Sequence, residues 1–72
     1  MNNEFLEERI NKAKEIFHDK KQKKFLKRWL LEKFSEENQS ITFIKYFGEY
    51  YDNLNEEDYI KMFLFYIGQK NQ

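Results

Sequence analysis

The segment from Tyr59 to Ile67 places apolar or aromatic side chains in every direction of a helical wheel, and Lys61 is its only charged residue. A helix that is apolar all round is normally buried on all sides. Three partner helices can surround such a helix, and a second copy of the chain would do so more easily. We therefore expect an all-α protein, a compact bundle of about four short helices built on this segment, with homodimerisation as a way to complete its core.

The rest of the composition favours a single helical domain. The chain has 72 residues, with no proline, only two glycines and no cysteine. Proline and glycine are the two strong helix breakers, so their scarcity suits helices. Without cysteine there is no disulfide or thiolate metal site, and apolar packing or association must stabilise so short a chain. We expect one domain over residues 1–72.

The phase of the apolar residues separates two helices in the first half of the chain. Their apolar faces are formed by Leu6, Ile10, Ala13 and Phe17 in one helix and by Phe25, Leu26, Trp29, Leu30 and Phe34 in the other. The two faces are about 150° out of phase, so one straight helix could not bury both. We place the break within residues 18–24, with Asp19 as an N-cap and Gln22 in the capping-box position. Trp29 should be buried against the first and fourth helices.

Two further boundaries follow from polar residues. Residues 35–40 form a polar cluster that reads as a loop after the second helix. Asn55 is a good N-cap for the last helix, because three acidic residues fill the first turn that follows. Leu54 and Tyr59 stand in the positions of a hydrophobic staple across this cap. The fourth helix then runs to about Gly68.

Charge is zero overall but unevenly distributed. Residues 19–34 carry seven basic and two acidic residues, whereas residues 35–72 carry seven acidic and three basic residues. The basic side of the second helix includes Lys20, Lys21, Lys24, Lys27 and Arg28, with Leu31 in its middle. A solvated amphipathic face explains this pattern most simply. Two functional alternatives remain open, namely contact with nucleic-acid phosphates and contact with an acidic protein that has an apolar notch for Leu31.

Several other functions are poorly matched by the residues. His18 is the only histidine, and with Glu15 it offers two metal ligands, too few for a tight site. No glycine-rich nucleotide motif appears, so we expect no catalytic residues, no cofactor and no metal. Binding to a membrane surface would need the apolar side of the basic helix, which the core requires. The longest apolar run is six residues, against about 20 for a membrane span. We expect no membrane association and a cytoplasmic location.

Three stretches carry a family resemblance. The order FLKRWL, then Thr42 and Tyr46 at the opening of a helix, then NEEDYIKMFLFYI loosely resembles the helical core-binding domain of tyrosine recombinases. This resemblance adds weight to DNA binding among the alternatives.

The sequence as a whole indicates a small non-enzymatic protein that acts by macromolecular binding. The expected role is that of a protein-binding regulator, inhibitor or accessory factor. Its aromatic residues exceed the needs of one small core, and aromatic side chains are favoured in protein contacts. The alternative is a nucleic-acid-binding accessory protein that uses the basic face of the helix over residues 20–33.

Overall fold

The computed structural model describes residues 3–68 and the side chains of residues 5–67. This part of the chain forms α1 (Asn3–Phe17), α2 (Lys20–Glu36), α3 (Ile41–Asp52), α4 (Glu56–Phe63) and the π-helical turn η1 (Leu64–Gly68). The all-α bundle of four short helices expected from the sequence is confirmed.

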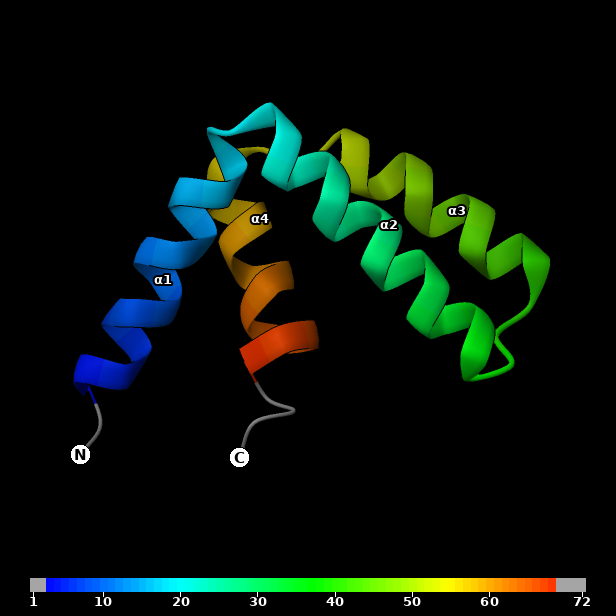
Figure 1. Ribbon diagram of the computed structural model, residues 1–72, viewed down its shortest axis with the longest axis horizontal. Coiled ribbons are helices and arrows are strands. Elements are labelled where there is room, and N and C mark those ends of the chain that lie inside the picture. The colour runs from blue at the N-terminus through cyan, green and yellow to red at the C-terminus, as the bar shows by residue number, and fades with distance from the viewer. Residues whose placement is uncertain (1–2, 69–72) are drawn as a thin grey trace.

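The helices form two antiparallel pairs that meet at an angle (Figure 1). Helix α2 packs along α3, whereas α1 packs against α4 and η1 and also contacts α2. The Cα atoms span 38 × 26 × 17 Å. The short dimension leaves room for two layers of helices, because a helix with its side chains is about 10–12 Å across. The bundle is therefore flattened, and each helix keeps an outward side.

Both N-caps expected from the sequence are confirmed. The Asp19 carboxylate accepts the backbone N–H groups of Lys21 at 3.0 Å and Gln22 at 3.2 Å. The Gln22 side-chain amide donates to the other carboxylate oxygen at 3.0 Å. Hydrogen bonds from the Gln22 amide and backbone hold the pKa of Asp19 below its usual value. At the start of α4, the Asn55 side chain accepts the N–H of Asp58 at 2.8 Å.

The loop between α2 and α3 is set by backbone hydrogen bonds at the end of α2. The N–H of Gln39 donates to the Phe34 carbonyl at 3.0 Å, and the N–H of Asn38 donates to the Ser35 carbonyl at 3.1 Å. This pair of bonds is a Schellman motif. It requires a left-handed residue, and Asn38 has φ 63°. Ser40 then caps α3, so the loop lies inside the polar cluster identified in the sequence.

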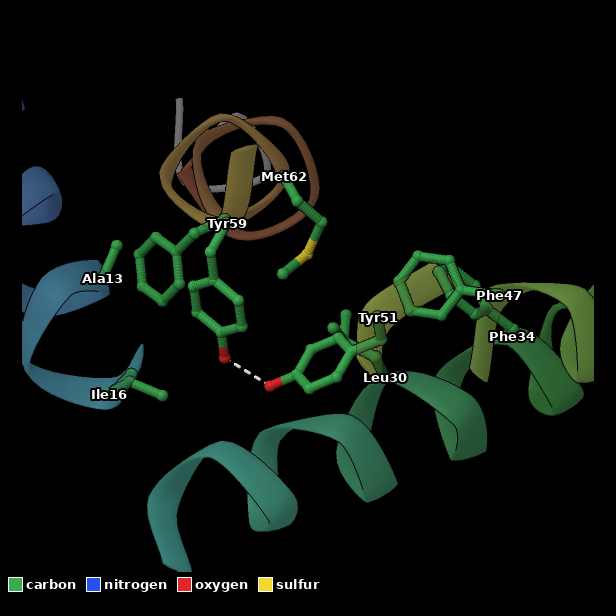
Figure 2. Close-up of a cluster of buried hydrophobic side chains, with 9 residues drawn as sticks. Ala13, Ile16, Leu30, Phe34, Phe47, Tyr51, Tyr59 and Met62 are labelled. Carbon is green, nitrogen blue, oxygen red and sulfur yellow. Dashed lines mark hydrogen bonds between the residues drawn. The ribbon is translucent and has the colours of Figure 1, made fainter. Parts of the chain in front are cut away.

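The core draws side chains from all four α-helices (Figure 2). The buried set comprises Ala13, Ile16, Leu30, Phe34, Phe47, Tyr51, Tyr59, Met62 and Phe63. At its centre the hydroxyl groups of Tyr51 and Tyr59 are hydrogen-bonded to each other. Ala13 and Ile16 approach Tyr59 from α1, while Phe34 and Phe47 pack together where α2 meets α3.

The expected burial of Trp29 against the first and fourth helices is wrong. Trp29 is 38% exposed and Phe25 is 69% exposed. The apolar face of α2 spans about 180° of the helical wheel, with Leu30 and Phe34 near one edge and Phe25 at the other. The neighbouring helices cover the Leu30 edge only. The flank that carries Phe25 and Trp29 stays open.

Helices α1 and α4 also depart from the expected burial at their ends. Leu6, placed on the apolar face of the first helix, is 46% exposed, and the buried residues of α1 are Ala13 and Ile16 in its second half. Tyr59 is fully buried in α4, whereas Phe65 in η1 is 57% exposed. The last helix is thus covered along α4 but not around the whole of the π-helical turn.

Candidate interaction surfaces

The basic side of α2 forms a pocket with the end of α3. The pocket has a volume of about 350 Å³ and is lined by Lys20, Lys23, Lys24, Lys27, Tyr51 and Asp52. The four lysines stand at helical positions i, i+3, i+4 and i+7, which share one side of a helix. We call this site the lysine pocket.

Two of the four ammonium groups are held by neighbours. The Lys27 Nζ atom lies 2.8 Å from Asp52 Oδ2. The Lys27 stem passes over Gly48, where a Cβ atom would stand 3.7 Å from Lys27 Cε. The Lys23 Nζ atom lies 4.4 Å from the centre of the Phe17 ring, in a cation–π arrangement. Both ammonium groups are therefore positioned by the fold.

The other two lysines of the pocket, Lys20 and Lys24, are exposed. Among the side chains of residues 5–67, neither has an ion-pair partner. Asp52 is thus the single carboxylate against four ammonium groups in the pocket. Its surface is strongly positive.

The tyrosine wall of the pocket has a fixed hydrogen-bond direction. The Tyr51 hydroxyl donates to the Lys23 carbonyl at 2.6 Å. Because a hydroxyl has one proton, the Tyr59 hydroxyl must be the donor in the Tyr51–Tyr59 bond. Burial raises the pKa of both tyrosines, so both stay neutral at physiological pH. Tyr51 therefore lines the pocket with a fixed ring. Its hydroxyl proton is donated to the Lys23 carbonyl and is not free to bond a ligand.

The structure divides the binding residues expected on the basic helix into two groups. Lys20, Lys24 and Lys27 meet in the pocket, whereas Lys21 and Arg28 are exposed and do not line it. Leu31 is half-buried and packs against the core. The fold itself covers much of its side chain, which weakens the expectation of an apolar anchor ringed by lysines.

A second surface consists of aromatic side chains on α3 and η1. Phe43, Tyr46 and Tyr50 are 37%, 72% and 43% exposed, and Tyr66 is half-buried beside them. The Tyr66 ring lies 5.4 Å from the ring of Phe47, which itself lies 5.7 Å from Tyr50. The Phe43 ring lies 6.4 Å from the same Phe47 ring, so Phe47 links Phe43, Tyr50 and Tyr66. Tyr46 stands on the same side of α3, about 60° from Phe43 and about 40° from Tyr50. We call Phe43, Tyr46, Tyr50 and Tyr66 the aromatic face.

Two of the three charged residues of α3 lie away from the aromatic face. At about 100° per residue, Lys45 and Asp52 stand about 100° and 120° from Tyr46, whereas Glu49 stands about 60° from Tyr46 and borders the face. Burial, with Tyr50 nearby, raises the pKa of Tyr66, so this ring is also neutral at physiological pH. The four side chains of the aromatic face are therefore uncharged, with Glu49 at its border.

The exposed flank of α2 adds a smaller aromatic pair. Phe25 and Trp29 stand one turn apart, and the Lys33 Nζ atom lies 5.4 Å from the centre of the Trp29 ring. Lys33 covers part of the indole through a cation–π contact. Trp29 is the only tryptophan of the chain, so its fluorescence reports on this flank.

His18 takes part in the packing of α1 and α4. Its Nε2 atom lies 2.5 Å from Glu56 Oε2, which joins the end of α1 to the first turn of α4. Glu15, the other member of the weak metal pair considered from the sequence, contacts Lys12 instead. Among the side chains that the structure describes, those of residues 5–67, no three of the metal-binding types are grouped to hold an ion. None of the helices described is long and apolar enough to cross a lipid bilayer.

Comparison with protein-family models, with curated proteins and with solved structures gives no match to this chain. The loose resemblance to the core-binding domain of tyrosine recombinases therefore gains no support.

Proposed function

We propose that this chain is a non-enzymatic cytoplasmic protein that acts by binding another protein, as a regulator, inhibitor or accessory factor. The observation that carries the proposal is the aromatic face on α3 and η1. Tyr and Phe are enriched at the centres of protein interfaces, where charged residues are depleted. The aromatic face has this composition, and Tyr46, its most exposed member, is 72% exposed.

The size of the aromatic face suits one protein contact. At about 200 Å² for a fully exposed aromatic side chain, the exposed parts of Phe43, Tyr46 and Tyr50 amount to roughly 300 Å². A standard interface uses about 800 Å² on each partner, a little over half of it apolar. The aromatic face therefore supplies most of the apolar area that such a contact needs.

Site-specific photocrosslinking in cells of the source organism tests this proposal. A photoreactive phenylalanine analogue replaces Tyr46, and a matched control carries it at Lys45, about 100° away around α3. We expect discrete protein adducts from position 46 that survive nuclease treatment and are much weaker from the control. Equal adducts from both positions, or none from position 46, would count against a protein contact at the aromatic face.

The lysine pocket favours a second candidate, a nucleic-acid-binding accessory protein that uses the basic face of α2. Its four lysines could neutralise phosphates of a backbone. The acidic residues 35–72, with seven acids against three bases, would repel the same polyanion. We therefore rank this candidate below protein binding.

A further inference from the structure

The lysine pocket gathers four like charges, of which the fold pairs only that of Lys27 with a carboxylate. Lys20 and Lys24 are one helical turn apart, as are Lys23 and Lys27, and like charges at this spacing destabilise a helix. The side chain of Asp19 already accepts the first N–H groups of α2. The attraction of the pocket for an anion therefore comes from its ammonium groups. A bound anion would relieve their repulsion.

The lysines are concentrated in the pocket and not spread along α2. Lys20 and Lys27 are separated by about 10 Å along the helix axis, at 1.5 Å per residue. Lys21 and Arg28, the flanking cations of the same helix, do not line the pocket. Its volume of about 350 Å³ is that of a small-ligand site. A compact anion fits this arrangement better than an extended backbone.

We propose that the lysine pocket binds a compact ligand that carries two or more linked phosphate groups. Lysine ammonium groups bind phosphate as point charges. The four lysines span about 10 Å along the helix axis, so several linked phosphates match the pocket better than a single phosphate does. Two or three linked phosphates, laid along the pocket, could meet Lys20 and Lys24 as well as Lys23 and Lys27. This site is separate from the aromatic face and does not depend on the protein partner proposed above.

Asp52 competes with such a ligand. Its carboxylate holds Lys27 at 2.8 Å and is itself 58% exposed. An incoming phosphate group must share Lys27 with this carboxylate and is repelled by it. Replacing Asp52 with Asn keeps the shape of the side chain, removes the negative charge and frees Lys27. The substitution should therefore strengthen binding, which a loss of folding could not do.

Calorimetric titration with inorganic tripolyphosphate, in metal-free buffer at low ionic strength, tests the proposal. We expect saturable binding by the full chain. Lys24→Gln should weaken it by roughly five- to tenfold, and Asp52→Asn should tighten it several-fold. Lys21→Gln, with the same loss of charge outside the pocket, should change it by less than about twofold. Circular dichroism confirms that each variant is folded.

Each of the other outcomes overturns the proposal in a distinct way. No saturable binding would remove the site. Equal effects of Lys21→Gln and Lys24→Gln, or no tightening by Asp52→Asn, would show diffuse attraction without a pocket. Orthophosphate binding as tightly as tripolyphosphate would indicate a single-phosphate site. A single-stranded oligonucleotide binding more tightly than tripolyphosphate at the same salt would make the pocket part of a nucleic-acid surface.

Discussion

Trp29 is the residue whose surroundings differ most from those the sequence indicates. A buried aromatic side chain costs about 3–5 kcal/mol when replaced by alanine. Because Trp29 is 38% exposed on the open flank of α2, about 60% of it is still covered, and we expect Trp29→Ala to lower the free energy of unfolding by about 2–3 kcal/mol. Phe34→Ala, at a buried position of the same helix, should cost the full amount. Urea unfolding of both variants makes the comparison, and equal losses would contradict the exposed position of Trp29.

The Tyr51–Tyr59 hydrogen bond predicts that replacing either tyrosine with phenylalanine lowers the free energy of unfolding, by different amounts. It also predicts a fall in stability at alkaline pH. Tyr51→Phe leaves the buried Tyr59 hydroxyl without its acceptor, which costs about 1–3 kcal/mol. Tyr59→Phe removes a donor but leaves the Tyr51–Lys23 bond intact, so we expect a loss of about 1 kcal/mol. Unfolding in urea at pH 8 measures both, with the exposed Tyr46→Phe as a control near zero. Equal losses in the two buried variants would contradict the assigned donor direction.

The pH dependence has a definite sign. Burial raises the pKa of both tyrosines above the ordinary value of 10.0. As the pH rises, the unfolded chain therefore loses these protons before the folded chain does. The free energy of unfolding falls as a result. The contribution of the pair is present below pH 10 and is lost as the pH rises above it. Unfolding curves between pH 9 and pH 11 should show a smaller fall for Tyr59→Phe than for the unmodified chain.

At the scale of helices, the sequence was most informative where the interactions are local. The caps at Asp19 and Asn55 involve residues within three positions of each other, so spacing alone identified them. The burial of the apolar face of α2 does not depend on local interactions. This face is about 180° wide, and the positions of α3 and α1 decide which part of that face is buried. No local pattern carries this information, and Trp29 was therefore placed wrongly.

The lysine pocket was also only partly predictable from the sequence. Helical spacing placed Lys20, Lys24 and Lys27 on one side of α2, and the structure keeps them together. Tyr51 and Asp52 complete the pocket from α3, more than 20 residues further along the chain. Their contribution depends on the antiparallel pairing of α2 and α3, which the sequence does not specify. The aromatic face likewise requires η1 to lie beside α3.

The whole molecule is flattened, and this shape explains its exposed aromatic residues. A two-layer arrangement with a short dimension of 17 Å leaves each helix an outward side. Four aromatic residues, Phe5, Phe25, Tyr46 and Phe65, are more than half exposed, although the core is also rich in aromatic residues. The surplus of aromatic residues seen in the sequence therefore lies on the surface, where it is available for contacts.

A second copy of the chain could occupy the aromatic face, and purified protein alone is enough to test this homodimer. The formal net charge is zero, so two copies do not repel each other strongly, and the aromatic face itself is uncharged. Two such faces together provide roughly 600 Å² of aromatic surface, below the 1,200 Å² or more of a stable complex. We therefore expect a weak homodimer that forms as the concentration rises, with the mass by light scattering increasing from monomer towards dimer.

Tyr46→Glu with Tyr50→Glu should hold the protein at the monomer mass, because docking would bury two carboxylates without partners. A monomer mass for the unmodified chain at high concentration would exclude this dimer and leave the aromatic face to a different protein.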